Sequence, residues 1–507
     1  MKLRQSMAGL HTWGGLLPSW LLFVIIFAGT VACFDKELSR WMRPALHEGV
    51  VSSLSADDVR GWLQQNVSEE LHAFWMHGPT EREPYWRLGW EVDGTETFHS
   101  VAFDPRSEPV KPMPETVGGD FFFKLHYNLH AGDVGMYIVG LSGMFMLVAL
   151  VSGVIIHRRI FKDFFTLRPR ANGQRAWLDA HNLFGVVGFP FHLVLAYTGV
   201  AIFVASYMPA AAQVGYAGNV MQYFDEVMGS YHRDELHQPA ATPASLDTLI
   251  AESRRQWNDG EVGWVSVHHP DDASAVVDVR RRDDSRIGSP QDTLTYDATT
   301  GELLNRQDAS SGYRAYVWLA GLHMAQFGGA LVRLLYLLLG LCGCAMLVGG
   351  LQVWLAKREE RGDGSLIWVR ALSAAVFAGL PLASLALLWG NRLIPMNLAE
   401  RAVAEGWVFV GAWLLVALWA GLQRRHGRRL LRHQLSLGAI LALGLPLLNA
   451  LTTEGHLTAS LARGDWMLAS VDLFLIATGL ICAACAWRLK AASDAVAVAQ
   501  ANQVQEA

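Results

Sequence analysis

Eight long apolar runs are the feature that most constrains the fold of this 507-residue chain. A helix needs about 20 apolar residues to cross the hydrocarbon core of a bilayer, and each run has about that length or more. The runs lie near residues 13–34, 134–157, 182–206, 330–356, 368–390, 403–422, 433–453 and 465–487. Hydrophobic residues make up 52% of the chain, which is high for a soluble protein. The sequence therefore predicts a predominantly α-helical, multi-pass membrane protein with about eight transmembrane helices.

Basic residues gather after every second apolar run, near residues 158–175, 357–361, 424–432 and 488–490. Because basic loops stay on the cytoplasmic side, we expect both termini in the cytoplasm. The two long loops, about residues 35–125 and 207–320, then face outward. Both loops mix acidic and basic residues without a basic patch, so we expect no nucleic-acid partner. The first run is too long for the apolar region of a signal peptide, so we expect it to remain as a membrane helix.

The two outer loops share an outline in which one helix precedes several short strands. The helices are expected to begin at Ser55 and Ser245, which are good N-cap residues. The strands are predicted at Tyr85–Glu91, Thr97–Phe103, Val262–His268, Ala275–Arg281 and Thr293–Tyr296. This pattern indicates one small α+β module that is used twice.

These features divide the chain into seven predicted parts. They are residues 1–34 (transmembrane helix 1), 35–133 (first outer module), 134–206 (transmembrane helices 2 and 3 with a basic loop), 207–320 (second outer module), 321–358 (transmembrane helix 4), 359–490 (a four-helix membrane extension) and 491–507 (a disordered cytoplasmic tail). No comparable histidine lies in the last four spans, and we expect no chemistry there. A packing role or a homodimer contact remains open for the extension.

Histidines recur in a matched frame within the first four spans. His11 and His181 each open an apolar run and are followed by glycine four and eighteen residues later. His130 and His323 each precede a further run, and each is followed by glycine five residues later. The recurrence predicts that the first four helices form a duplicated pair of helices.

A polar side chain in a membrane span costs free energy, so it is a candidate functional residue. If two repeats pack about an axis along the membrane normal, His11 faces His181 and His130 faces His323. Two facing imidazoles are the axial ligands of a six-coordinate b-type haem, which suits electron transfer. We therefore predict two b-type haems with these four histidines as iron ligands. His126 and His157 are alternate ligands, and any single histidine could instead bond a backbone carbonyl.

Other residues near these histidines are candidates for holding the same cofactor. Four glycines lie about one turn beyond the histidines and would leave room for a flat macrocycle, although ordinary helix packing explains them equally well. They are Gly15, Gly185, Gly135 and Gly328. Arg158, Arg159 and Arg333 are candidates to pair with the haem propionates, while the first two also suit a topology signal. No catalytic residue separate from the haems is expected.

Several segments resemble the PepSY-associated transmembrane family, over roughly residues 1–358. They are LHTWGG, LHYNLHAGDVG, SGVIIHRR, AHNLFGVVGFPF and LHMAQFGG. The outer modules, with LSADDV and YDATTGELL, look like PepSY domains. The resemblance implies a protein of the bacterial inner membrane that is linked to iron uptake. It also implies a ferrisiderophore reductase that uses two b-type haems and faces the periplasm with its outer modules.

Two functions follow as alternatives. In the first, electrons from a quinol or from a cytoplasmic flavin or NAD(P)H reductase cross the lipid bilayer and reduce an Fe(III)-siderophore, which releases Fe(II). No G-x-G-x-x-G or P-loop motif is present, so any nucleotide would act through a separate partner. In the second, a non-redox, membrane-anchored PepSY protein binds a peptide, a protease or a receptor. A purified protein that is red favours the first function, and a colourless one favours the second.

Overall fold

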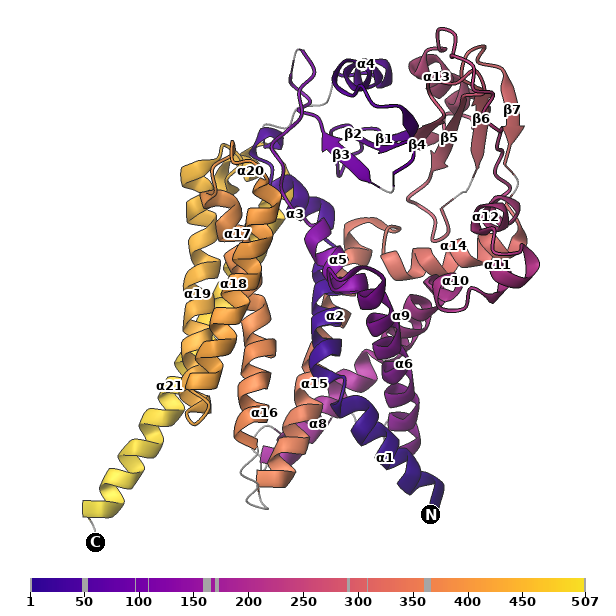
Figure 1. Ribbon diagram of the computed structural model, residues 1–507. Helices are drawn as coiled ribbons and strands as arrows, with labels where there is room; N and C mark the ends of the chain where they lie inside the picture. The colour runs from indigo at the N-terminus through magenta and orange to yellow at the C-terminus, as the bar shows by residue number, and fades with distance from the viewer. Residues whose placement is uncertain are drawn as a thin grey trace. The chain divides into compact units, whose positions relative to one another are not determined.

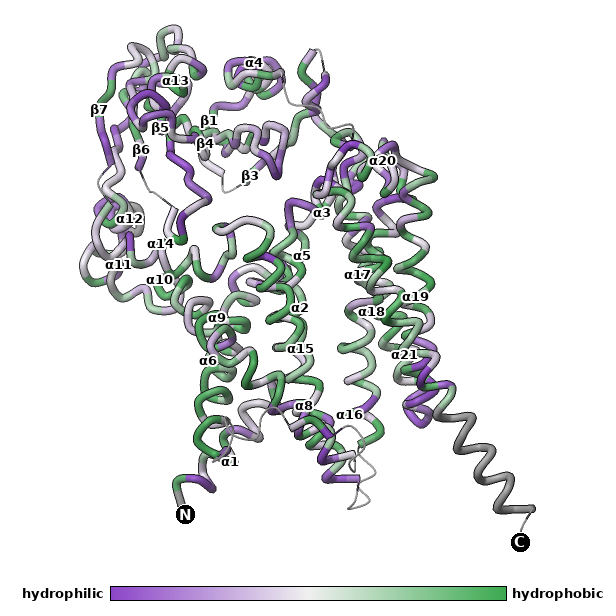
Figure 2. The backbone as a smooth tube through the Cα atoms, turned by 180° about the vertical axis from the view of Figure 1, so that it is seen from behind, coloured by the Kyte–Doolittle hydropathy of each residue, from purple (hydrophilic) through white to green (hydrophobic). Residues whose placement is uncertain are grey.

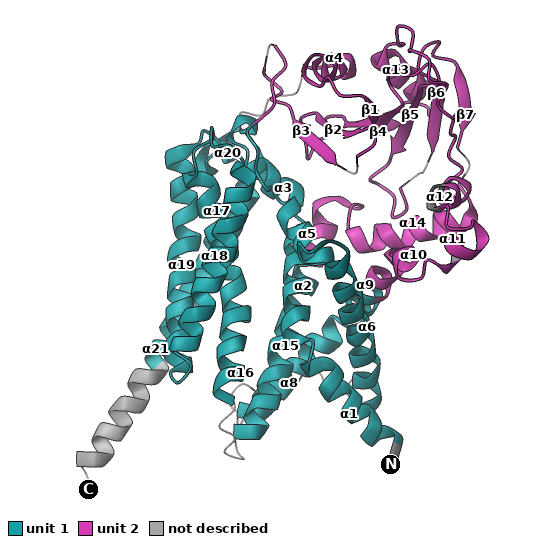
Figure 3. Cartoon of the chain, in the orientation of Figure 1, with its two compact units in different colours: residues 1–48, 114–196, 337–507 teal, residues 49–113, 197–336 magenta. Residues whose placement is uncertain are grey.

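The computed structural model describes residues 2–47, 53–95, 97–107, 109–157, 166–168, 173–289, 292–307, 309–359 and 366–505 (Figure 1). Within these residues the chain is mostly helical, with one antiparallel sheet. This confirms the prediction of a predominantly α-helical protein. The chain divides into two compact units (Figure 3). Unit 1 comprises residues 1–48, 114–196 and 337–507, and unit 2 comprises residues 49–113 and 197–336.

Six helical segments of the described chain are long and apolar enough to cross a membrane. They are α6 (Gly132–Ile156), α15 (Gly329–Glu359), α16 to α17 (Leu366–Leu393), α18 (Arg401–Leu422), α19 (Gly427–Thr452) and the Trp466–Ala491 part of α21 (Trp466–Gln505). Large apolar side chains such as Leu414 and Leu415 on α18 are 65% and 68% exposed. Such surfaces are stable only when a bilayer or a partner covers them.

Two further candidate spans are bent helix pairs. The first pair is α1 (Lys2–Leu16), of which residues Leu3–Leu16 belong to the span, and α2 (Ser19–Ala32), and the bend between them is 61°. The second pair is α8 (Gly173–Val187) and α9 (Phe189–Ile202), with a bend of 66°. Pro18 lies in the first break, where its missing N–H interrupts the helical hydrogen bonds. If each pair is one span, the described chain has eight, which matches the number expected from the sequence.

Unit 1 is built around a core that joins the first helices to the last ones. Its buried side chains come from α2, α3 (Asp35–Trp41), α5 (Asp120–Asn128), α17 (Gly379–Leu393), α19 and α21. Trp41 and Leu380 lie at its centre with no exposed surface. The four-helix extension therefore packs directly against α2, α3 and α5. Figure 2 shows these helices as largely hydrophobic along their length.

Unit 2 contains one seven-stranded antiparallel sheet with the strand order β3-β2-β1-β4-β5-β6-β7. The strands are β1 (Leu71–His77), β2 (Arg87–Val92), β3 (Phe98–Ala102), β4 (Glu261–His268), β5 (Val276–Arg282), β6 (Thr293–Asp297) and β7 (Leu303–Arg306). Phe74 of β1 pairs with Val267 of β4, so strands from the two outer loops meet at the centre of one sheet. The sequence indicated a module in each loop, whereas the structure joins their strands into a single layer.

Helices α4 (Ala56–Asn66) and α13 (Leu246–Gln256) contribute to the same hydrophobic core as the sheet. The N-termini of α4 and α13 cap one another. The Asp247 carboxylate accepts hydrogen bonds from the N–H groups of Ala56 and Asp57, at 3.0 and 3.2 Å. In return, the Asp57 carboxylate accepts from the N–H of Leu246 at 3.0 Å and from the Ser245 hydroxyl at 2.5 Å. The exchange satisfies helix N-terminal donors that would otherwise lack partners.

Short elements complete the described chain. They are the 3₁₀ turn η1 (Pro44–Leu46), α10 (Val204–Tyr207), α11 (Ala210–Gly215), α12 (Val220–Met228), α14 (Ser311–Met324), α16 (Leu366–Ser373), the π-helical turn η2 (Ala374–Ala378) and α20 (Leu457–Ala462).

Candidate functional site

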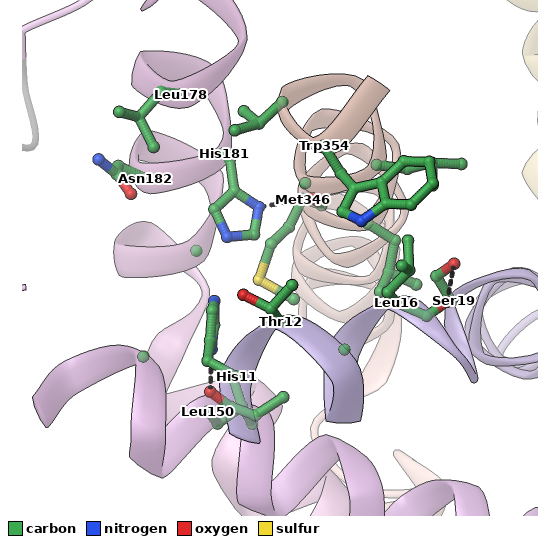
Figure 4. A pocket seen from close by; sticks show the side chains of 18 of the residues that line it. His11, Thr12, Leu16, Ser19, Leu150, Leu178, His181, Asn182, Met346 and Trp354 are labelled. Carbon is green, nitrogen blue, oxygen red and sulfur yellow. Dashed lines mark hydrogen bonds between the residues drawn. The ribbon is translucent and has the colours of Figure 1, made fainter. Parts of the chain in front are cut away.

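His11 on α1 and His181 on α8 come together in unit 1, as the sequence predicted. Their ring centroids are 6.1 Å apart and their planes are inclined by 66°. Figure 4 shows the two rings approaching one another from separate helices. Each histidine lies seven residues before the break in its helix, at Pro18 and Gly188.

Both imidazoles are anchored in the same way. His11 donates from Nδ1 to the carbonyl oxygen of Ala149 on α6, and His181 donates from Nδ1 to the carbonyl oxygen of Met346 on α15, each at 2.8 Å. A carbonyl can only accept, so each neutral ring carries its proton on Nδ1 and leaves the Nε2 lone pair available. This arrangement is typical of metal-binding histidines, whose second nitrogen is held by a carbonyl or carboxylate.

A glycine lies beneath each of these rings, one helical turn after the accepting carbonyl. A Cβ atom at Gly153 would lie 3.1 Å from Cε1 of His11, and a Cβ atom at Gly350 would lie 3.1 Å from Cε1 of His181. The missing side chains let each imidazole lie close against the neighbouring helix. Spacing along the chain pointed to other glycines, because it does not show which helix a ring contacts.

The two rings line a cavity of about 490 Å³, which is within the usual range of small-molecule sites. Lys357 and Arg358 also line it, and the Arg358 guanidinium lies 3.8 Å from the centre of the Trp354 ring. Among the described residues, Trp354 Nε1 is a buried donor without a hydrogen-bond partner at this cavity. His157 is a third histidine in the lining.

These features fit a flat, acidic metal chelate such as haem. Metal–imidazole bonds of about 2 Å on both sides of one ion would place two ring centroids about 6 Å apart, close to the spacing of His11 and His181. Lys357 and Arg358 would offset the negative charge of propionates. Gly15 and Gly185 line the cavity, and a Cβ atom at Gly15 would meet nothing within 4 Å.

Gly135 and Gly328 have local structural roles. A Cβ atom at Gly135 would lie 1.8 Å from the carbonyl oxygen of Asn128, so only glycine permits this close approach. Gly328 has a φ of +72° in the turn before α15, a conformation that favours glycine. Neither lines the cavity that contains His11 and His181.

His126 and His130 lie close in sequence but are held differently. His126 donates from Nδ1 to the carbonyl oxygen of Ile25 at 2.8 Å, and a Cβ atom at Gly29 would lie 2.6 Å from the same nitrogen. The accepting carbonyl again precedes the contacted glycine by one helical turn. In contrast, His130 has a φ of 54°, and its Nε2 bonds the carbonyl oxygen of Phe121 at 2.9 Å. His126 therefore repeats the arrangement of His11 and His181, whereas His130 does not.

His323 lies on α14 in unit 2. Its Nδ1 is 3.0 Å from the hydroxyl of Thr198, and a Cβ atom at Gly199 would lie 2.8 Å from its Cε1. Gly29 and Gly199 are the glycines that follow His11 and His181 by eighteen residues. Gly29 and Gly199, which recur at the same spacing in the sequence, are therefore the positions where His126 and His323 contact neighbouring helices.

The predicted cationic partners are placed as follows. Arg333 lies on α15 in unit 2, and it is not part of the cavity lining formed by the described residues. Arg158 and Arg159 lie outside the described residues. In the described part of the chain, Lys357 and Arg358 are the cationic side chains at the cavity, whereas the sequence predicted only that they belong to a basic loop.

The C-terminal extension contains a buried charged network that was not predicted from the sequence. Arg401 pairs with Glu405 at 2.5 Å, and both side chains are almost fully buried. Glu405 also accepts from the side chain of Asn391, while Asp472 accepts from Trp41 Nε1 at 3.0 Å. Glu405 and Asp472 lie inside apolar runs, and such charges are candidates for buried pairing. That signal was available in the sequence.

Comparison with known proteins gives a similar chain. It is an uncharacterized protein from Pseudomonas aeruginosa, 28% identical over 382 residues, which cover 73% of this chain and 94% of that protein. The family described as PepSY-associated TM region matches residues 8–357, more than half of the chain, so this protein belongs to the PepSY-associated TM family.

Proposed function

We propose that this protein is a membrane electron-transfer protein that holds two b-type haems and reduces an Fe(III)-siderophore. The observation that carries the proposal is the pair of imidazoles at His11 and His181. They come from different helices, they lie 6.1 Å apart at one cavity, and both are anchored through Nδ1. A haem iron with two imidazole ligands exchanges one electron and has no open position for oxygen chemistry.

Different residues of this chain would bind the cofactor, orient the binding side chains and balance its charge. His11 and His181 present the Nε2 lone pairs, while the carbonyls of Ala149 and Met346 orient the two rings. Lys357 and Arg358 provide positive charge at the cavity. This set of groups would fix the orientation of an acidic macrocycle and exclude water from its faces.

For the second haem we propose His126 of unit 1 as a ligand, and His323 of unit 2 remains a ligand predicted from the sequence. Each ring is held at Nδ1 and rests on the glycine eighteen residues after His11 or His181. His130 bonds a backbone carbonyl through Nε2, the nitrogen that a ligand would need. This replaces His130, which was expected from spacing alone, by its alternate His126.

The repeated arrangement of histidines and glycines supports an internal duplication of the first four spans. The mutual capping of α4 and α13 by Asp57 and Asp247 supports the same idea for the outer loops. On this proposal the outer loops are two PepSY-like modules that share one sheet. We propose that this sheet lies in the periplasm and both termini in the cytoplasm of a bacterium, as the positive-inside pattern predicts.

The substrate and the electron donor follow from the resemblance to ferrisiderophore reductases. A quinol or a cytoplasmic flavin or NAD(P)H reductase would supply one electron for each Fe(III). Reduction converts the chelated Fe(III) to Fe(II), which is less hard and is bound less tightly by an oxygen-rich chelate. Fe(II) would then be released for uptake.

Haem content tests the proposed ligands. The protein, expressed with ample haem and purified in detergent, should contain two b-type haems per chain. His11→Ala, His181→Ala, His126→Ala and His323→Ala should each retain one haem, while His130→Ala and His157→Ala should retain two. A colourless wild-type protein would refute the proposal and favour the non-redox alternative. One haem in His130→Ala with two in His126→Ala would restore the pairing expected from the sequence.

Electron transfer to the substrate needs its own experiment. The reduced protein is mixed with an Fe(III)-hydroxamate siderophore, and re-oxidation is followed by absorbance while a ferrous chelator reports the Fe(II) formed. The Ga(III) complex of the same siderophore is the control, because it has a similar shape and charge but is not reduced. Re-oxidation should occur with iron and not with gallium. Equal behaviour of the two complexes would rule out siderophore reduction.

A further inference from the structure

We infer that unit 2 contains a binding site for a divalent transition-metal ion, formed by His72, Glu235 and His269. The inference does not rest on the proposed haem function. One ligand atom from each of these residues lies within 4.8 Å of the others. The His72 and His269 rings are 5.0 Å apart and nearly perpendicular, at 87°. The three side chains come from segments far apart in sequence, which converge on one point.

The contact between Glu235 and His269 is more than a surface ion pair. The side chain of His269 is only 17% exposed, and its Nδ1 is buried. This nitrogen contacts the Glu235 carboxylate, but the pair lacks the directional geometry of a hydrogen bond. A buried imidazole nitrogen close to a carboxylate, without a hydrogen-bond partner of its own, is available to bind a metal ion.

The backbone around the three side chains is held by hydrogen bonds. The N–H of His269 donates to the carbonyl oxygen of His72 at 2.8 Å, which ties the turn after β4 to the start of β1. The Asp272 carboxylate accepts from the N–H groups of Leu236 and Gln238, at 3.0 and 2.9 Å. These bonds hold the chain just after Glu235 to Asp272, which lies three residues after His269.

Asp272 remains ionised in this role. Hydrogen bonding by Ser274, followed by the N–H groups of Leu236, Ser274 and Gln238, lowers the pKa of Asp272 well below its usual value. The loop that carries Glu235 has no regular secondary structure at this position, and this carboxylate fixes it.

The ligand chemistry points to a particular class of ion. Two imidazoles with one carboxylate suit Zn²⁺, Fe²⁺ and similar divalent ions, whereas Ca²⁺ and Mg²⁺ prefer oxygen ligands alone. His237 is a candidate fourth ligand, because its Nδ1 lies 3.5 Å from the other Glu235 oxygen and its side chain is 84% exposed. Water would complete the coordination otherwise.

Zinc binding to the full-length protein tests the site. The protein carries an affinity tag without histidine, and Zn²⁺ uptake is measured by equilibrium dialysis and elemental mass spectrometry. The difference between wild type and a variant reports this site separately from any zinc bound elsewhere. His269→Ala and Glu235→Gln should each lose one equivalent of tightly bound Zn²⁺, with affinity at this site falling at least tenfold. An excess of Ca²⁺ should not displace the ion.

The matched control is His99→Ala, because His99 lies on β3 of the same sheet, where its ring stacks on Trp90. This variant should bind zinc as the wild type does. Equal zinc binding by wild type, His269→Ala and Glu235→Gln would overturn the inference. An equal loss in His99→Ala would do the same, because it would show a non-specific effect of removing a histidine.

A second measurement avoids the risk that a variant fails to fold. The wild-type protein is treated with diethyl pyrocarbonate with and without Zn²⁺, and modified histidines are located by mass spectrometry. Zinc should protect His72 and His269 at least fivefold and leave His99 unprotected. Modification of His72 and His269 that does not change with zinc would contradict the site.

Discussion

Single carbonyl and glycine contacts define the candidate haem site at the level of residues. The sequence predicted the pairing of His11 with His181, because equal spacing to later glycines marks equivalent positions. It did not distinguish His126 from His130, which are four residues apart and would share one face of a continuous helix. The structure ends α5 at Asn128, and His130 then turns back onto the carbonyl of Phe121. The spacing of the residues does not show that the helix ends before His130.

Gly153, which lies beneath the ring of His11, gives a prediction about a single residue. Gly153→Val places a branched side chain where even a Cβ atom would lie 3.1 Å from the ring of His11. We expect the ring to be displaced and one of two haems to be lost, as measured by haem content. Gly411→Val on α18 is the matched control, because nothing lies within 4 Å of its added Cβ atom. Retention of both haems in Gly153→Val would contradict the proposed ring position.

His47 gives a second prediction, which concerns pH. Burial, followed by the nearby Arg392 charge, lowers the pKa of His47 from its usual value to about 3. The unfolded chain therefore binds a proton on His47 below about pH 6.5 that the folded chain does not. Stability should be intact above that pH and should fall as the pH drops toward 3, by up to about 1.4 kcal/mol per pH unit.

The measurement is thermal unfolding of the detergent-solubilised protein between pH 7 and pH 4.5. His47→Gln, which cannot be protonated, should show a smaller loss of melting temperature over this range than the wild type. His99→Ala on the exposed face of β3 is the control and should behave as the wild type does. An identical acid response of His47→Gln and wild type would show that His47 does not contribute.

At the level of elements, hydrogen bonds at the N-termini of α4 and α13 connect the two outer loops. The sequence located the starts of α4 and α13 at Ser55 and Ser245, because serine is a good N-cap. It gave no indication that Asp57 and Asp247 cap each other's helices, since that contact joins residues about 190 positions apart. Nor did it predict β1 or the pairing of β1 with β4, which depends on the two loops meeting. Long-range contacts of this kind leave no periodic pattern in a sequence.

The reciprocal cap predicts a measurable loss of stability. Asp247→Ala removes two acceptor contacts at the N-terminus of α4 and should destabilise the folded sheet unit by about 1–2 kcal/mol. Hydrogen–deuterium exchange at α4 should rise accordingly. Glu81→Ala removes an exposed acidic side chain outside the caps and serves as the control. Unchanged exchange at α4 in Asp247→Ala would show that the cap contributes little.

For the whole molecule, the main finding is that the C-terminal extension is joined to the family region by buried polar contacts. The family match ends at residue 357, yet Trp41 and Thr116 bond Asp472 and Glu405 of the extension. The sequence predicted no role for these helices, because they carry no histidine that matches those of the first four spans. Charges within apolar runs were the signal, but their partners could be found only from the fold.

Breaking one buried pair tests this connection. Arg401→Leu leaves Glu405 buried without its partner and should lower stability by about 3–5 kcal/mol, or prevent accumulation of the protein in the membrane. The double variant Arg401→Leu/Glu405→Met removes both charges and should recover much of the loss. Thermal unfolding and the amount of protein in the membrane fraction report both effects. A double variant no better than the single one would contradict a pairwise role.

The central claim is that His11 and His181 bind the same haem iron from opposite sides. Electron paramagnetic resonance of the oxidised protein tests it most directly, because two imidazole ligands make ferric haem low-spin. We predict a low-spin ferric signal that accounts for all the haem in the wild type. In His181→Ala, half of it should be lost or converted to a high-spin signal. A protein without ferric haem, or a low-spin signal that is unchanged in His181→Ala, would contradict the account.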